Sequence, residues 1–400
     1  MSITVLLDLD DTLLINNIDS FKVAYFKALC KHLEPIPADL VVQMLVRGVQ
    51  AMIEKDLPAN TLEESFDREF YPGIGISKNE LRRKIIYFYQ EIFPTLKPYT
   101  QIRPMSVNLV DYCFKMGYTV AIATNPVFPR AATLHRLSWA GLESNDFPFT
   151  LVSTYENFHF AKPNPTYFTE FIGQLGWPDR PVVMIGNSFK EDVIPVSKLG
   201  IPVFWVTEVD DQLPEYRHPL SQKGHFESAQ GWIKSLSGVN FETRFRSKDA
   251  ILSIFKSTPA VLDTMQKGFD ATGSNQNNKH SDLLELIGQK AKSDIEILEA
   301  LAKESLINSM GDLQSVIETQ SIVDEHNRLP AGLQQLLRAR TILIASLFPF
   351  ALDNWSSEIH VAHKEPTTIG KLLEELAEHD LRDLKKAHSI LSSLNNFPTK

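Results

Sequence analysis

Short apolar runs and longer helical patterns alternate along the first half of the chain. Five runs consist mainly of β-branched or aromatic residues, each long enough to cross a sheet and too short for a helix; they cover residues 3–9, 119–124, 149–153, 182–185 and 202–206. Helical patterns separate the later runs, over residues 105–115, 129–139, 166–175 and 192–199. Strands that alternate with helices predict βαβ units, and therefore an α/β fold with a doubly wound parallel sheet.

The interval between the first two predicted strands contains helical patterns only. They cover residues 20–32, 38–55, 61–70 and 78–92. A block of this size predicts a separate helical lobe over residues 15–100, inserted into a core made of residues 1–14 and 101–210. We expect the lobe to lie over the carboxyl ends of the strands, where ligands bind in such folds.

The strand pattern ends after residue 208. Residues 211–245 are expected to form a loop-rich linker with one short helix. From residue 246 to residue 400 the pattern is helical, over residues 247–268, 281–306, 333–348 and 368–391. This favours an all-α domain built as an antiparallel four-helix bundle. Residues 271–278 are polar and low in complexity, so we expect a loop there.

Composition narrows the possible functions. The 400 residues are 43% hydrophobic and 22% charged, as is typical of a globular protein with two or three domains. The net charge of −9 argues against broad attraction to nucleic acid or to an anionic membrane. The longest apolar stretch, residues 341–352, is too short to span a bilayer and contains Pro349.

The cysteine content and the first residues bear on the compartment. Cys30 and Cys113 are the only cysteines, too few and too far apart for a disulfide framework or a thiolate zinc site. The opening residues lack the basic segment and apolar core of a signal peptide. We therefore expect a cytoplasmic protein.

Side chains that can take part in catalysis follow the predicted strands. The first strand ends in Asp8-Leu9-Asp10-Asp11-Thr12, a segment that by itself is equally typical of a solvated turn. Three further segments follow later strands: Thr124-Asn125, the lysine of Ala161-Lys162-Pro163, and Gly186-Asn187-Ser188-Phe189-Lys190-Glu191-Asp192. Because parallel strands bring their carboxyl ends to one edge, we expect acids, a hydroxyl and a lysine to converge there.

At these residues the chain resembles the haloacid dehalogenase superfamily, a group dominated by phosphatases. The four motifs of that family occur in order over about residues 1–210, and the helical insert is similar to the family's helical cap. The resemblance implies a Rossmann-like core. It also implies a phosphomonoesterase that cleaves a small phosphorylated metabolite.

The roles implied by this resemblance follow phosphoryl transfer. Asp8 would attack phosphorus and form an aspartyl-phosphate. Asp10 would protonate the leaving alkoxide and then deprotonate the attacking water. Lys162 and the hydroxyl of Thr124 would bind the phosphoryl oxygens. We further expect substrate contacts from three residues near the motifs, namely Thr12, Asn125 and Arg130.

The resemblance also implies a bound Mg²⁺. Its ligands would be the Asp8 carboxylate, the Asp10 backbone carbonyl and an oxygen from the fourth motif. The family's fourth motif often opens with Gly-Asp, but here it opens with Gly186-Asn187. Either Asn187 or Asp192 could therefore be the direct ligand. Alone, Asn187 is also typical of a turn.

Asp10 decides between two chemistries. Relatives that cleave carbon–halogen or carbon–phosphorus bonds generally lack an acid at this position, so a phosphate ester is the better substrate. Those bond cleavages remain the alternative activity. A second alternative is a catalytically weak protein that binds a phosphorylated ligand and acts as a scaffold.

Substrate choice is expected to depend on the cap. Its polar candidates, most of them more typical of solvated faces, are Asn16, Asn17, Arg47, Lys55, Arg68, Arg82 and Arg83.

The C-terminal helices, over about residues 246–392, resemble the DinB-like bundle family. Members bind a divalent metal through one histidine of the second helix and two of the last. Here His379 fits the last helix, but Asp383 stands four residues later and His388 nine residues later. His280 begins the second helix, and no histidine lies between His280 and His326. We therefore predict a metal-free bundle that mediates dimerisation or docks a protein partner.

Overall fold

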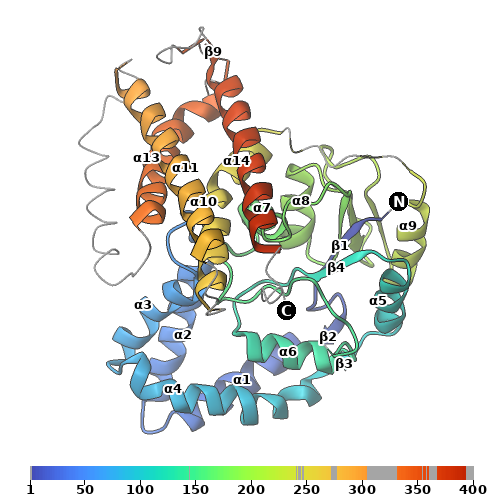
Figure 1. The fold of residues 1–400 in the computed structure, drawn as a ribbon. Helices are drawn as coiled ribbons and strands as arrows, with labels where there is room; N and C mark the ends of the chain where they lie inside the picture. The colour runs from blue at the N-terminus through green and yellow to red at the C-terminus, as the bar shows by residue number, and fades with distance from the viewer. Residues whose placement is uncertain are drawn as a thin grey trace.

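The computed structural model describes residues 2–143, 145–239, 241, 245, 247–271, 277–303, 331–353, 355–356, 358–359 and 367–392. Figure 1 shows an α/β core, a helical cap below it and a group of C-terminal helices beside both. None of the helices in this described part of the chain has the length and hydropathy that a membrane span requires.

The core is a five-stranded parallel sheet in the order β4-β1-β5-β6-β7. The strands are β1 (Thr4–Leu7), β4 (Thr119–Ile122), β5 (Val182–Gly186), β6 (Val203–Val206) and β7 (Gln222–Gly224). Leu7 at the end of β1 lies opposite both Ile122 of β4 and Ile185 of β5, so the carboxyl ends of these three strands meet at one edge of the sheet. The predicted doubly wound parallel fold is confirmed.

Helices cover both faces of this sheet. They are α5 (Ser106–Lys115), α6 (Arg130–Trp139), α7 (Pro165–Gln174), α8 (Ile194–Lys198) and α9 (Ala229–Ser235). A π-helical turn, η3 (Phe189–Val193), precedes α8, and a short 3-10 helix, η4 (Phe226–Ser228), precedes α9.

Two sheet predictions differ from the structure. Residues 149–153 do not form a strand; they run beside β4, and Val152 makes a single bridge to Ile122. The Ser153 hydroxyl bonds the carbonyls of Ile122 and Thr124, which ties the segment to the end of β4 in place of a longer ladder. The fifth strand is instead β7, from the stretch expected to be a linker. Its residues Gln222 and Lys223 are exposed, so β7 has no apolar run to reveal it.

The cap is entered and left through a small antiparallel pair, β2 (Leu14–Asn16) and β3 (Thr100–Ile102). Between these strands lie α1 (Ile18–His32), α2 (Ala38–Ile53), α3 (Leu62–Ile74) and α4 (Lys78–Tyr87). A π-helical turn, η1 (Phe88–Ile92), and a 3-10 helix, η2 (Phe93–Tyr99), complete the insert. Capping boxes at Thr61 and Ser77 fix the starts of α3 and α4.

The described C-terminal part contains α10 (Lys248–Ala271), α11 (Asn277–Lys303), α13 (Ala331–Asp353) and α14 (Ile369–Ser392). A short antiparallel pair, β8 (Glu358–Ile359) and β9 (Thr367–Thr368), precedes α14. The helical content of this region is as predicted. Within the expected loop 271–278, residues 272–276 lie outside the described residues, as does His326.

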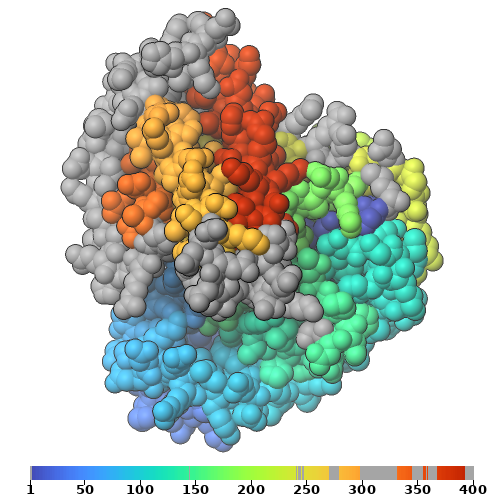
Figure 2. Space-filling model, viewed as in Figure 1, coloured from blue at the N-terminus to red at the C-terminus, as the bar shows by residue number. Residues whose placement is uncertain are grey.

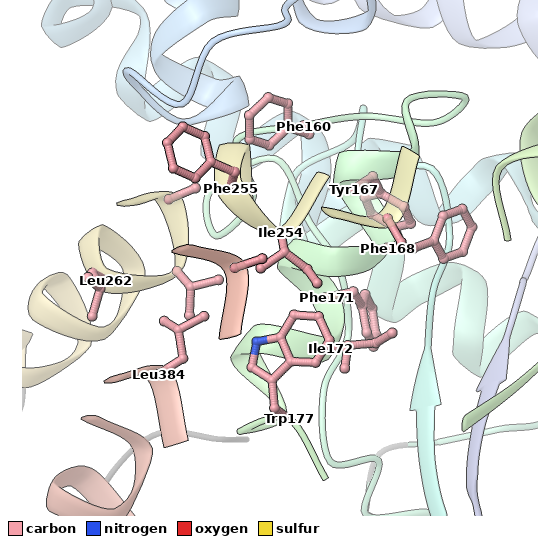
Figure 3. Close-up of a cluster of buried hydrophobic side chains, with 14 of the residues drawn as sticks. Phe160, Tyr167, Phe168, Phe171, Ile172, Trp177, Ile254, Phe255, Leu262 and Leu384 are labelled. Carbon is pink, nitrogen blue, oxygen red and sulfur yellow. The ribbon is translucent and has the colours of Figure 1, made fainter. Parts of the chain in front are cut away.

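Helix α10 packs directly on α7 of the core. Figure 3 shows Phe168, Phe171 and Ile172 of α7 in one apolar cluster with Ile254 and Leu262 of α10, all of them buried. Figure 2 shows α14 (red) side by side with the core as well. The bundle therefore buries its first helix against the core and shares a single hydrophobic cluster with it.

A buried ion-pair group occupies the interior of the C-terminal helices. Arg340 lies 2.7 Å from Asp294 and 2.6 Å from Asp380, and Lys290 also contacts Asp380. His379, the residue before Asp380 in α14, is exposed. In the described residues, no three His, Cys, Asp or Glu side chains are arranged to hold a metal ion.

A second buried group ties the core to α10. His159 lies just before the loop that carries Lys162, and its ring contacts Glu170 of α7 and Asp263 of α10, both at 2.8 Å. Lys267 is 3.0 Å from Asp263. Burial disfavours the charged imidazole, but the two carboxylates outweigh it and raise the pKa of His159.

Replacing His159 with glutamine is therefore expected to destabilise the protein in a pH-dependent way. The contribution of a protonated His159 is fully present below its unfolded-state pKa of about 6.5 and is lost as pH rises through the higher folded-state value. Breaking a buried pair costs about 3 kcal/mol, so we expect a difference of that order near pH 6 and a smaller one near pH 9. Urea unfolding at both pH values measures it, with the exposed His225→Gln as control. A loss of unfolding free energy that is larger at pH 9 than at pH 6 would contradict a protonated His159 paired with the two carboxylates.

Candidate active site

The first motif lies where β1 ends. The backbone N–H of Asp8 still bonds the carbonyl of Ile185 at 3.0 Å, and the chain then turns away through Asp11, whose φ is 57°. Asp tolerates this left-handed conformation better than most residues. The turn returns Thr12 to the site, where its hydroxyl donates to Asp8 Oδ2 at 2.9 Å and lies 3.0 Å from Asn187 Oδ1.

Lys162 lies at the centre of the site and is 1% exposed. Its Nζ donates to Asp8 Oδ1 at 2.8 Å and to Asp192 Oδ1 at 2.6 Å. Burial disfavours the ammonium form, but Asp192 and Asp8 outweigh it and raise the pKa of Lys162. The side chain is therefore a fixed positive charge beside Asp8.

Asp192 is buried in the π-helical turn after β5. Its Oδ2 accepts the backbone N–H of Ser188 at 3.0 Å, so both of its oxygens have partners. Burial raises the pKa of Asp192 to about 7, against the opposing effect of Lys162. Asp192 and Asp8 together hold the Lys162 ammonium in place.

Gly186 leaves room for that carboxylate. A Cβ at this position would lie 2.4 Å from Asp192 Cγ, closer than real Cβ contacts. Gly186→Ala is expected to cost about 1–3 kcal/mol of unfolding free energy, because the short buried side chain has no space to move. Gly231→Ala in α9 is the matched control, since no atom lies within 4 Å of its Cβ. Thermal or urea unfolding compares them, and equal stabilities would contradict the packing described.

Asp10 has a different set of partners. Its Oδ1 contacts the guanidinium of Arg136 and accepts from Asn16 Nδ2 at 3.2 Å. Arg136 extends from α6, is buried, and lies against the rings of Phe21 and Phe128. Partial burial beneath the cap raises the pKa of Asp10, and Arg136 opposes the rise.

Sequence reasoning missed Arg136. The signal was its place in the predicted helix 129–139, four residues after Ala132 and three before Trp139, both of which are buried. An arginine on the apolar face of a helix needs a buried partner, and an acid of the first motif was available.

The remaining candidates lie at different distances from this centre. Thr124 is buried beyond β4, and its carbonyl accepts from Tyr167 Oη at 2.8 Å. Asn125 Nδ2 donates to Glu191 at 3.3 Å and to the carbonyl of Lys162 at 3.4 Å. Arg130 is exposed at the start of α6 and does not line the cavity between the cap and the core that is described next.

A cavity of about 580 Å³ lies between the cap and the core and reaches Asp10, Arg136 and Glu191. The cap cations named from the sequence do not line it. Arg47 pairs with Glu69, and Lys55 donates to the carbonyls of Asn60 and His159. The other three, Arg68, Arg82 and Arg83, are exposed. Of the two asparagines, Asn16 contacts Asp10 and Asn17 caps α1.

The oxygen atoms around Thr12 and Lys162 suit a hard cation. Asp8 Oδ2 and Asn187 Oδ1 lie within hydrogen-bond distance of one hydroxyl, and the other Asp8 oxygen lies on Lys162. Carboxylate, amide and carbonyl oxygens are the ligands that Mg²⁺ takes. Asp8 and Asn187 therefore offer, side by side, the kinds of oxygen that Mg²⁺ takes.

Comparison with known proteins was made on sequence and on structure. Residues 4–200 match the family model of haloacid dehalogenase-like hydrolases. No curated protein matches the chain in sequence. Similar solved structures include a HAD phosphatase from Thermococcus onnurineus, with 20% identity, a TM-score of 0.38 and coverage of 58% of this chain and 98% of that one. Another is a 2-haloacid dehalogenase from Pseudomonas syringae, with 18% identity, a TM-score of 0.41 and coverage of 59% and 99%.

Proposed function

We propose that the protein is a Mg²⁺-dependent phosphomonoesterase, because residues 4–200 match the family model of haloacid dehalogenase-like hydrolases. Its substrate is a small phosphorylated metabolite, and the reaction passes through an aspartyl-phosphate at Asp8. The observation that carries the proposal is the placement of the two acids of the first motif, one paired with a buried lysine and the other lining a cavity. Asp8 lies against Lys162, and Asp10 lines the cavity between the cap and the core.

The first step uses Asp8 as the nucleophile. One carboxylate oxygen attacks phosphorus, a new oxygen–phosphorus bond forms, and the bond to the alcohol oxygen breaks. Lys162, held by Asp192, offsets the repulsion between the carboxylate and the phosphoryl oxygens. The hydroxyl of Thr12 holds Asp8 in the orientation that this attack needs.

Asp10 supplies and removes the proton. It protonates the departing alkoxide in the first step and takes a proton from water in the second, which releases inorganic phosphate and restores Asp8. Arg136 and Asn16 both contact Oδ1, so we assign the proton transfer to Oδ2. The raised pKa of Asp10 favours the protonated acid that the first step requires.

Bound Mg²⁺ would supply further positive charge to the phosphoryl oxygens. We propose Asn187 as the direct ligand from the fourth motif, because its Oδ1 lies 3.0 Å from the same Thr12 hydroxyl that donates to Asp8 Oδ2, whereas Asp192 is bound to Lys162 and Ser188. Asp192 is then a positioning residue for Lys162.

Three further expectations from the sequence stay proposals. We propose that residues 15–100 act as one cap inserted in the core, and that the C-terminal helices mediate dimerisation or dock a protein partner. We also propose a cytoplasmic location, because the two cysteines are both free, as is typical of a reducing compartment.

Phosphate release from a panel of monoesters, with Mg²⁺ and with a chelator, tests the proposed function. We expect turnover with Mg²⁺ and at least about a 100-fold loss with the chelator, because a metal ion contributes several kcal/mol of transition-state stabilisation. Added Mg²⁺ should restore the activity. If folded protein saturated with Mg²⁺ hydrolyses none of the esters, the proposal is contradicted.

A further inference from the structure

The cavity between the cap and the core has an aromatic wall. Phe21 and Tyr25 come from α1, Phe66 from α3, Tyr89 from η1, and Phe128 and Tyr155 from the core. Its volume of about 580 Å³ is in the range of pockets that hold a drug-sized molecule. Ring packing preforms the wall. The ring centroid of Phe66 lies 5.1 Å from that of Phe70, in a stacked pair, and 6.4 Å from that of Tyr155.

Gly48 of α2 is part of how this wall is built. A Cβ at Gly48 would lie 2.5 Å from the ring of Phe66, so only glycine lets the ring lie against the helix at this position. Aliphatic side chains of α2 continue the same surface, among them Leu45, Val46 and Val49.

Some of the polar groups in the wall already have partners. The hydroxyls of Tyr25 and Tyr89 bond each other at 2.9 Å. Of the two cations that line the cavity, Arg136 is paired with Asp10, and Lys22 is solvent-exposed. A sugar or an amino acid placed against the aromatic and aliphatic part of this wall would lose bonds to water without gaining partners there, at a cost that favours an apolar body.

We propose that the cavity binds the leaving group, and that the substrate is the phosphate monoester of an apolar alcohol with an aromatic or alicyclic body. The proposal rests on the phosphomonoesterase function above. Its products are inorganic phosphate and the apolar alcohol, which receives its proton from Asp10. The apolar body gains binding energy from the surface that it removes from water.

The test compares two primary alkyl phosphates whose leaving alkoxides are of the same kind: 2-(2-naphthyl)ethyl phosphate and glycerol 3-phosphate. We expect kcat/KM to favour the naphthyl ester by at least about 100-fold. Val46→Glu should reduce that preference at least about tenfold, because Val46 lines the cavity and a carboxylate there would disfavour an apolar ligand. The variant should fold, since Val46 is 52% exposed. Val23→Glu is the matched control, since Val23 is 68% exposed on α1 and lies outside the cavity wall.

Binding separates the two proposals. Calorimetry with 2-(2-naphthyl)ethanol measures occupation of the cavity without any turnover. Binding that Val46→Glu weakens, with no hydrolysis of either ester, would support the apolar site and overturn the phosphatase. Hydrolysis with equal or greater preference for glycerol 3-phosphate would overturn the apolar site and leave the phosphatase intact. Absence of both binding and hydrolysis would overturn both.

Discussion

Replacing Asp8 with asparagine is expected to lower ester hydrolysis by at least about 10⁴-fold, the order seen when a catalytic nucleophile is removed. Asparagine has the same shape and retains an oxygen for the Thr12 hydroxyl, so the fold should survive. Its amide is a far weaker nucleophile than a carboxylate. Lys162 keeps its second partner, Asp192, and so is not left as an unpaired buried charge. Steady-state release of phosphate in saturating Mg²⁺ measures the loss.

Asp11→Asn is the matched control for this variant. It makes the same change three residues along the chain, at a position where φ is 57° and asparagine is also tolerated. The Asp11 side chain accepts the backbone N–H of Asn16 at 2.8 Å, a bond that asparagine can also accept. Near-normal activity is expected. If Asp8→Asn hydrolyses the ester as fast as Asp11→Asn does, Asp8 is not the nucleophile.

Replacing Asp10 with asparagine should separate esters by their leaving groups. An alkyl alkoxide needs a proton as it departs, so the first turnover of an alkyl phosphate should slow by about 10²–10⁴-fold. An aryl oxide is a stable anion and needs little help, so its first turnover should stay fast. Water activation is lost in both cases, and aryl phosphate should therefore show one rapid equivalent followed by slow turnover. Rapid-mixing kinetics with matched alkyl and aryl phosphates measure both phases.

The same variant distinguishes the rival chemistry. Cleavage of a carbon–halogen bond needs no proton on the leaving group. Rapid first-turnover halide release by Asp10→Asn, together with no hydrolysis of any phosphate ester by the unaltered protein, would favour a dehalogenase.

The sequence allowed the sheet and the strand-end motifs to be predicted because both depend on local signals. Buried parallel strands are continuous apolar runs, and reactive side chains follow them at the carboxyl ends. Strand β7 was missed for the same reason, since Gln222 and Lys223 are exposed and provide no apolar run. Residues 149–153 misled in the opposite direction, because an apolar segment at a sheet edge looks like a strand in sequence even where it makes one bridge.

Arg136 and the aromatic cavity depend on contacts between segments far apart in the chain. Arg136 meets Asp10 across 126 positions, and Phe128 reaches the cavity only because the cap folds over the core. The cap cations were candidates for substrate binding because their charge can be identified from the sequence alone. Their ion pairs and exposure, which decide whether they face a ligand, become visible only once α2 and α3 are packed.

The C-terminal helices were predictable as helices but not in their attachment. Their amphipathic pattern indicates a bundle, whereas the burial of α10 against α7 depends on Gly173, whose Cβ would lie 2.6 Å from Val261. The His159 contact to Asp263 likewise joins segments 104 positions apart. Its place beside the Lys162 loop connects the bundle physically to the active site.

The covalent state of Asp8 during turnover tests the central claim most directly. Asp10→Asn, mixed with 4-nitrophenyl phosphate and Mg²⁺ and quenched in acid, should carry one phosphoryl group on the peptide that contains Asp8. Hydroxylamine should remove that group, as it does from an acyl phosphate, and Asp8→Asn combined with Asp10→Asn should remain unlabelled. One equivalent of nitrophenolate released from protein that stays unmodified, or a phosphoryl group on another residue, would contradict the account.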